Sequence, residues 1–276
     1  MIDATSTAAR IRPVERAGSR PIPTILPKGL AMETQRPVAE ERLYRKQRLA
    51  VAFRMFGRAG LGLGASGHIT ARDPEHPDCF WVNPLCLPFS RIRVSDLLLV
   101  DEKGRVLEGD RIVNEAAFAI HVEVHRARPD AVAAAHAHSF YGKVWSAARR
   151  PIEPICQDSA MFYDDHAIFN EYTGVVSSFS EGRMIADALG DRSTVLLANH
   201  GHLTVGGSVE TAAWRFLAFE EACRVQLLAG QVGGMIPMSH EIAVKAQRMG
   251  GSEAAGRYSF EPYWLEFIEQ EPDLLD

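Results

Sequence analysis

The chain has 276 residues, of which 46% are hydrophobic and 24% charged, and its formal net charge at pH 7 is −5. This composition is typical of a globular protein, and the charge gives no electrostatic footprint for nucleic acid or an anionic membrane. No stretch approaches the roughly 18 uncharged apolar residues of a membrane span. The four cysteines are widely spaced and lack a C-x-x-C pair, which indicates free thiols in a reducing compartment, so we expect a cytoplasmic protein.

The N-terminal part of the chain divides into an arm and the start of a domain. Residues 1–37 hold five of the fifteen prolines and little periodicity, which predicts a flexible N-terminal arm: either a tail or a segment that orders only against a partner subunit. Apolar residues then recur at helical spacing from Val38 to about Gly57, where a series of glycines ends the predicted helix. Short apolar runs with turn signals between them predict a meander of antiparallel strands at residues 80–82, 97–101 and 105–107.

Helices alternate with buried strands in the rest of the chain. This alternation predicts a single layered α/β domain over residues 38–230. Residues 231–276, with one more helix and a Trp/Tyr/Phe-rich tail, form a predicted helical and aromatic extension that packs on the domain or on a neighbouring subunit. The predicted helices are 115–127, 141–149, 180–189, a long helix capped by Ser208, and 240–248, and the predicted buried strands are 131–135 and 194–198.

Histidines stand at the ends of the two buried strands. His136 and His138 follow the apolar run 131–135, and alternate side chains of a strand point to one face, so these two imidazoles project together. His200 follows the second strand in the same way. If the strands are adjacent and end at one sheet edge, three imidazoles meet, which is the donor set of a catalytic metal site. The alternative is a set of separately hydrogen-bonded core histidines, but the paired placement favours a metal.

Other polar residues near these strands have two readings each. His121 and His125 have the i, i+4 spacing of helical metal ligands, but their apolar neighbours favour packing and hydrogen bonding. Glu115 is either a fourth ligand or base, or simply an acid that the helix dipole favours. His202, two residues after His200, faces either the site or the opposite side, and in an extended strand it would share the face of His200.

Four motifs follow one another along the chain: Ser66-Gly67-His68-Ile69-Thr70-Ala71-Arg72, Arg128-Pro129-Asp130, His136-x-His138 and Leu197-Ala198-Asn199-His200-Gly201. In this order they resemble the class II aldolase/adducin head domain family. The resemblance covers about residues 40–228 and implies a three-layer α/β/α sandwich around a mostly antiparallel sheet. It also implies one divalent ion on His136, His138 and His200, for which zinc, manganese, iron and cobalt are suitable, and a homotetramer with active sites between subunits.

Several positions depart from the family pattern. In the sugar-phosphate aldolases a glutamate four residues before the helix histidine is ligand and acid/base, but that position holds Ala117 here. Glu115 is two residues away, about 200° round the helix. The family's loop asparagine is replaced by His68, and its phosphate-binding threonine-glycine pair aligns with Leu85-Cys86. Neither of these side chains can donate to a phosphate, so we expect a non-phosphorylated substrate.

The expected chemistry follows from these retained and missing groups. The family's reactions share a metal-stabilised enolate, and decarboxylation needs an electron sink and a proton donor but no initiating base. We predict a metal-dependent carbon–carbon lyase that decarboxylates a small keto or hydroxyaromatic acid. His68 would orient the substrate, and Tyr163 or His166, from a loop that is equally suited to a subunit contact, would donate the proton. The alternatives are retro-aldol cleavage of a hydroxy-keto acid, with His68, Glu115 or water as base, and an adducin-like interaction domain without catalysis.

Overall fold

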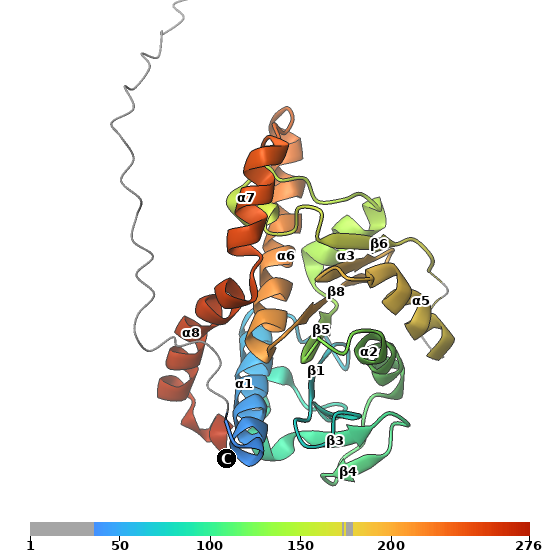
Figure 1. Ribbon diagram of the computed structural model, residues 1–276, viewed down its shortest axis with the longest axis vertical. Coiled ribbons are helices and arrows are strands. Elements are labelled where there is room, and N and C mark those ends of the chain that lie inside the picture. Colours follow the sequence, from blue (N-terminus) through green and yellow to red (C-terminus); the bar gives the residue numbers. More distant parts are fainter. Residues whose placement is uncertain (1–35, 173, 175–178) are drawn as a thin grey trace, which may run out of the picture. The chain divides into compact units, whose positions relative to one another are not determined.

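A mixed, mostly antiparallel sheet of eight strands lies at the centre of the computed structural model, which describes residues 36–172, 174 and 179–276 (Figure 1). The strand order is β4-β3-β2-β1-β5-β8-β7-β6. Neighbouring strands pair antiparallel, except β6 and β7, which are parallel. The strands are β1 His68–Arg72, β2 Cys79–Val82, β3 Leu98–Asp101, β4 Val106–Glu108, β5 Ala133–Ala137, β6 His166–Phe169, β7 Thr194–Leu197 and β8 Gly201–Gly206.

Helices pack against the central strands through alternate side chains. On β5, Ala133, Ala135 and Ala137 belong to an apolar cluster with residues of α1 and α6, whereas Ala134 belongs to another with residues of α2 and α5. A strand that is buried on both faces reads as a continuous apolar run, which is why the five residues before His136 are all apolar. The α-helices are α1 Val38–Arg58, α2 Glu115–Ala127, α3 Phe140–Ala148, α4 Gln157–Ala160, α5 Phe179–Leu189, α6 Val209–Ala229, α7 His240–Gly250 and α8 Glu253–Gln270.

The C-terminal segment packs on the same core. Phe260 and Phe267 of α8 are buried in the cluster that contains Phe53 of α1 and residues of α6. On α1, the Arg54 side chain donates to carboxylate oxygens of Glu271 at 2.7 Å and of Asp273 at 2.9 Å. Of the predicted N-terminal arm, only residues 36 and 37 lie within the described part of the chain.

The predicted helices and strands are all present in the structure, but β1, α4, β6, β8 and α8 lie outside the prediction. The strand β6 is absent from the prediction because it is a four-residue edge strand, in which three residues are only half-buried and no periodicity is visible. The strand β8 was also not predicted, and it lies between β5 and β7. The expectation that the two histidine strands are adjacent is therefore wrong.

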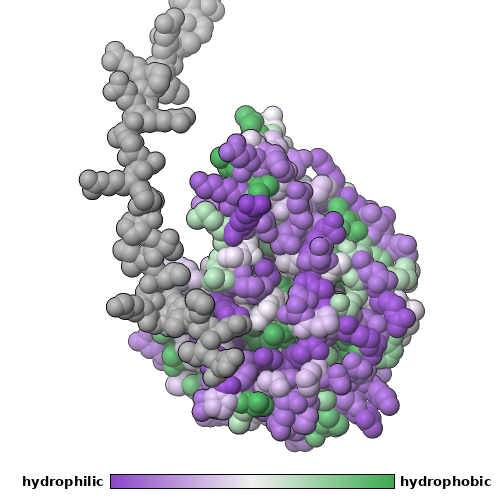
Figure 2. Space-filling view, viewed as in Figure 1, coloured by the Kyte–Doolittle hydropathy of each residue, from purple (hydrophilic) through white to green (hydrophobic). Residues whose placement is uncertain are grey.

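In the part of the chain that the structure describes, no helix combines the length and the apolar character needed to cross a membrane. Figure 2 shows a face on which hydrophilic residues predominate and hydrophobic residues are scattered. Scattered apolar side chains are normal on a folded protein.

Candidate metal centre

The third histidine reaches the other two through a turn. His136 is the fourth residue of β5, and His138 follows the strand directly. His200 is the last residue of the turn between β7 and β8, and β8 returns antiparallel along β5, pairing His202 with Ala137. The intervening strand therefore places His200 at the end of β5, although β7 itself is not a neighbour of β5.

The three imidazoles converge at this end of β5. One ring nitrogen from each of His136, His138 and His200 lies within 4.8 Å of the others. The Nε2 atoms of His138 and His200 are 2.9 Å apart. Two nitrogens bound to one ion at about 2.1 Å each lie roughly 3 Å apart, so the observed spacing fits a shared metal.

A backbone contact sets the ring orientation of His136. Its Nδ1 donates to the carbonyl oxygen of His202 at 2.8 Å. A carbonyl only accepts, so Nδ1 holds the proton and Nε2 carries the lone pair. Metal-binding histidines usually donate their second ring nitrogen in this way.

All three candidate ligands are held neutral. Burial lowers the pKa of His136 well below its usual value, and the neighbouring His200, His68 and His138 lower it further. Burial, followed by His138, lowers the pKa of His200 to about 4. Burial, followed by the Lys143 charge, also lowers the pKa of His138. Neutral imidazoles present lone pairs at pH 7, so a cation does not compete with protons there.

The turn that carries His200 depends on one glycine. Gly201 has φ +144°, a value that L side chains rarely adopt. A Cβ atom at this position would lie 3.4 Å from the Ala137 carbonyl oxygen and 3.9 Å from Cε1 of His136, which are ordinary contacts. The glycine is therefore required by the backbone conformation of the turn rather than by lack of space.

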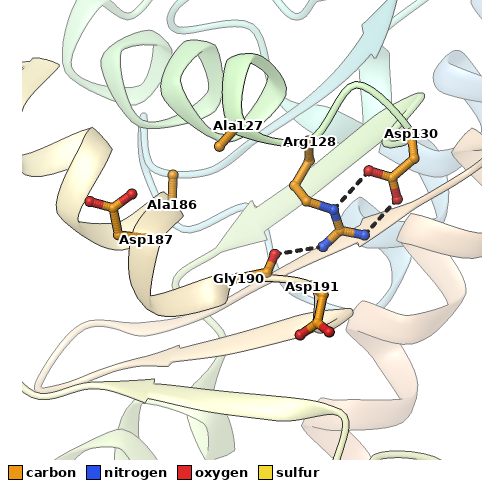
Figure 3. Close-up of a pocket in the computed structure, with 7 residues that line it drawn as sticks. All are labelled: Ala127, Arg128, Asp130, Ala186, Asp187, Gly190 and Asp191. Atoms are coloured by element: carbon orange, nitrogen blue, oxygen red, sulfur yellow. Dashed lines mark hydrogen bonds and ion pairs between the residues drawn. The ribbon is translucent and has the colours of Figure 1, made fainter.

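The beginnings of β5 and β7 are joined by Arg128. Its guanidinium donates to the carbonyl oxygen of Gly190 at 3.0 Å and to both carboxylate oxygens of Asp130 (Figure 3). It also donates to the carbonyl oxygen of Arg192 at 2.7 Å. Arg128 precedes β5, and Arg192 precedes β7. The Arg-Pro-Asp motif therefore aligns the two segments that lead to histidines. The surface hollow that these residues line lies at the opposite strand ends from the three imidazoles.

A layer of buried polar groups lies behind the metal-site histidines. His68 on β1 pairs in register with His136, and its ring centroid is 5.4 Å from that of His136 and 4.0 Å from that of His121 on α2. Thr70 Oγ1 contacts Nδ1 of His121 at 2.7 Å and Nε2 of His125 at 2.8 Å. His121 and His125 are thus packing and hydrogen-bonding groups, as the apolar neighbours indicate. Sequence reasoning missed Thr70, for which the only signal is a hydroxyl between Ile and Ala at the i+2 position from His68.

The predicted proton donors are not near this cluster within the chain. His166 pairs with Thr194 at the first residue of β7, three residues before Leu197, hence about 10 Å along the sheet from the end that leads to His200. Both of its ring nitrogens contact backbone groups, the Phe162 carbonyl and the Ile152 amide. Tyr163 precedes β6 at the same edge of the sheet, and its hydroxyl is 3.0 Å from Nδ1 of His240 on α7.

The remaining candidates are Glu115 and His202. Glu115 is exposed at the first residue of α2, about 9 Å along the helix axis from His121. His202 does not share the face of His200, because His200 lies in a turn, where strand alternation does not apply. The His202 ring instead stacks on Phe216 of α6 with 3.9 Å between centroids. Its contribution to the site is the backbone carbonyl that accepts from His136.

Comparison with known proteins supports a family assignment. Residues 47–227 match the model of the family described as "Class II Aldolase and Adducin N-terminal domain". The chain is 44% identical over 238 residues to the 4-hydroxy-3-prenylphenylpyruvate oxygenase/4-hydroxy-3-prenylbenzoate synthase of Streptomyces roseochromogenus subsp. oscitans, covering 86% of each chain. It is also 44% identical to the decarboxylase NovR of Streptomyces niveus, covering 86% of this chain and 88% of NovR.

The solved structures agree with these sequence matches. The L-fuculose 1-phosphate aldolase of Glaciozyma antarctica PI12 superimposes with a TM-score of 0.83 at 37% identity, covering 90% of this chain and 98% of the aldolase. Class II aldolases use a divalent metal ion. The similar proteins include a decarboxylase and an aldolase, and a metal-dependent enzyme of this family explains why three imidazoles cluster in the fold. The chain is therefore a metal-dependent lyase. The chain belongs to the class II aldolase and adducin family, and within it to the enzymes.

Proposed function

We propose that the enzyme removes CO₂ from a small, non-phosphorylated keto or hydroxyaromatic acid with the help of one divalent ion on His136, His138 and His200. The observation that carries this proposal is the convergence of three neutral imidazole nitrogens within 4.8 Å, a group that contains no carboxylate. The family's catalytic glutamate position holds Ala117. A decarboxylation tolerates this loss because it starts without removal of a proton.

The substrate class rests on two kinds of support. The two relatives at 44% identity are named for a prenylated hydroxyphenylpyruvate and benzoate, and as a decarboxylase. At the position of the family's phosphate-binding pair, Leu85 and Cys86 form a turn in which the Leu85 amide donates to the Ile112 carbonyl at 2.8 Å. An occupied amide and two side chains without strong donors provide no phosphate site. These features favour an acid whose only anionic group is a carboxylate.

The residues of the chain have distinct roles in this proposal. When bound, a divalent ion supplies a Lewis acid that polarises a substrate oxygen. His138 and His200 are only half-buried, so the open side of the cluster faces solvent, where substrate arrives. His68 and His136 are buried side by side on the inner side and exclude water from it. We assign His68, whose ring centroid lies 5.4 Å from that of His136, to substrate orientation from the inner side of the cluster, and Glu115 stays a candidate base for retro-aldol cleavage.

The position of the keto group decides whether an oxidant is required. Loss of CO₂ from a β-keto acid leaves an electron pair that the neighbouring carbonyl accepts. A para-hydroxyaryl acid is first protonated at the ring carbon that bears the carboxylate, and the electron pair of the breaking C–C bond then restores the aromatic ring, so neither reaction needs an oxidant. Loss of CO₂ from an α-keto acid leaves an acyl anion without such a sink, so that reaction needs an oxidant such as dioxygen. Because the name of one relative includes "oxygenase", dioxygen uptake separates these two substrate classes.

Retro-aldol cleavage is the second candidate, and the structural likeness to an L-fuculose 1-phosphate aldolase favours it. The test uses the purified chain loaded with zinc, manganese or ferrous iron. A β-keto acid, a 4-hydroxyarylpyruvate and a hydroxy-keto acid are each supplied, and CO₂, aldehyde and dioxygen are followed. We expect CO₂ from at least one of the first two acids. Aldehyde from the hydroxy-keto acid without CO₂ from either of the others would contradict the decarboxylase proposal.

The larger organisation is part of the same proposal. Members of the family commonly form homo-oligomers. We propose a cytoplasmic homotetramer in which residues 1–37 act as an arm, residues 38–230 form the catalytic domain as a three-layer α/β/α sandwich, and residues 231–276 extend it. The burial of Phe260 and Phe267 against α1 supports packing of the extension on its own domain.

A further inference from the structure

We infer that α3 holds His138 and His200 in position through contacts at its two ends. Glu220 on α6 is, in this inference, a positioning residue for His138. This inference rests on the proposed metal centre but concerns groups that touch neither metal nor substrate. The helix α3 begins two residues after His138, and its C-terminal end contacts the turn that carries His200. One rigid element thus connects the two ligands whose Nε2 atoms lie 2.9 Å apart.

The N-terminal end of α3 is held by a carboxylate from another helix. Glu220 accepts from Ser139 Oγ at 2.6 Å, from the Tyr141 amide at 2.8 Å and from the Gly142 amide at 2.6 Å. The first amides of a helix lack intrahelical partners, and the helix dipole favours a negative charge beside them. Ser139 is the N-cap residue but makes no capping bond of its own, since its hydroxyl donates to Glu220. Because Ser139 is bonded directly to His138, these contacts fix the backbone at the ligand.

The same end of α3 lies tightly against β8. A Cβ atom on Gly142 would lie 2.5 Å from both Ser139 Oγ and His202 Nδ1, a distance that real Cβ atoms essentially never show. His202 is the residue whose carbonyl oxygen accepts from His136. The position of α3 is therefore coupled to the strand that orients the third ligand as well.

The C-terminal end of α3 reaches the His200 turn. Arg149, the C-cap, has the left-handed φ of 51°, and its guanidinium donates to Asn199 Oδ1 at 2.9 Å. The Asn199 amide donates to the Ser146 carbonyl oxygen at 3.4 Å. Asn199 is itself left-handed, with φ 59°, and directly precedes His200. These contacts define the direction in which the turn presents His200.

Loss of the Glu220 carboxylate should act on metal affinity through His138. Without it the first turn of α3 has unpaired amides, and the backbone at His138 is free to shift. Substitution of groups that orient metal ligands typically lowers metal affinity by roughly 10- to 100-fold. A purely structural role would lower the unfolding midpoint but leave the metal site of the folded fraction unchanged.

The experiment compares Glu220→Gln and Glu220→Ala with Glu221→Gln in the full-length chain. Glu221 is the matched control, because it lies next to Glu220 on α6 and is exposed. Within the part of the chain that the structure describes, its side chain hydrogen-bonds only to Arg224, at 3.4 Å. Zinc affinity is measured by competition with a chromophoric chelator, and the visible spectrum of the cobalt-loaded protein reports ligand geometry. Unfolding midpoints are measured without metal. Ser139→Ala, which removes one of the three bonds, serves as a milder variant if the others fail to fold.

We expect both Glu220 variants to bind zinc roughly 10- to 100-fold more weakly and to change the cobalt spectrum. Ser139→Ala should show a smaller loss, and Glu221→Gln none. Folded Glu220→Gln and Ser139→Ala proteins with wild-type zinc affinity and cobalt spectrum would overturn the inference. If the wild-type chain itself binds no zinc or cobalt, the metal centre fails instead, so the two failures are distinguishable.

Discussion

Replacement of Thr70 by valine tests the buried polar layer behind the three metal-site histidines. His125 Nδ1 contacts the Ala131 carbonyl oxygen at 3.2 Å, so this nitrogen holds the proton and Nε2 is an acceptor. The Thr70 hydroxyl therefore donates to His125 Nε2 and accepts from Nδ1 of His121. Valine has nearly the same shape but neither function, so one ring acceptor and one ring donor lose their partners inside the protein.

The expected cost follows from the burial of these two ring atoms. His121 and His125 are 0% and 1% exposed, so water cannot replace the hydroxyl without a rearrangement. Each buried group that loses its partner costs about 1–3 kcal/mol, so the two groups together give a loss of roughly 2–6 kcal/mol in the free energy of unfolding. For a chain of this size the midpoint of thermal unfolding should fall by roughly 4–24 °C.

The assay is urea unfolding of the metal-free protein at pH 7.5, followed by circular dichroism. Thr204→Val is the control, because Thr204 is equally buried but its hydroxyl donates to only one group, the Ala212 carbonyl at 2.8 Å. We expect its loss to be about half that of Thr70→Val. A loss of less than about 0.5 kcal/mol for Thr70→Val would refute the hydrogen-bonded chain and the ring protonation derived from it.

The remaining predictions concern pH, strand alignment and backbone conformation. Burial lowers the pKa of His125 and of His202 to about 3, so the unfolded chain binds more protons between pH 6.5 and 3. The contribution of these two neutral histidines to the free energy of unfolding is therefore complete above pH 6.5. It should decrease at lower pH, by about 2 kcal/mol per histidine at pH 5. A urea midpoint that is equal at pH 7 and pH 5 would contradict this. Arg128→Ala should lower the unfolding free energy by about 1–3 kcal/mol by freeing two carbonyls, and calorimetry that detects no change would argue against its aligning role. Gly201→Ala should lower the free energy of unfolding by about 1–3 kcal/mol and weaken zinc binding, because a φ of +144° is strained for alanine. A folded variant with unchanged zinc affinity would show that the backbone conformation of this turn does not affect the metal site.

The helices and the central strands could be predicted from the sequence because their patterns are local. The spacing of Ala212, Phe216, Phe219, Cys223 and Leu227 predicts the inner face of α6. In the structure the first four are buried and Leu227 is half-buried. The alanines before His136 mark a strand that is covered on both faces. Both patterns indicate burial, because the apolar character of each side chain shows directly which positions face the core.

Contacts that depend on strand order could not be predicted in this way. The sequence does not show that β8 lies between β5 and β7. It therefore predicts that His200 meets His136 and His138 because their strands are neighbours, whereas in the structure the turn into β8 brings His200 to the end of β5. The face of His202 was expected from alternation, which fails because His200 lies in a turn. The three bonds of Glu220 to the start of α3 join residues about 80 positions apart, and no spacing rule covers such a distance.

The most direct test of the metal centre is the metal content of the wild-type chain and of His138→Ala after loading with zinc and extensive dialysis. His138 is half-buried, so its removal should leave the fold intact, and His76→Ala, at an exposed position, is the control. We expect one zinc ion per chain in the wild type and in the control, and nearly none in folded His138→Ala. A full equivalent of zinc in His138→Ala, or none in the wild type, would contradict the assignment of His136, His138 and His200 as the metal site.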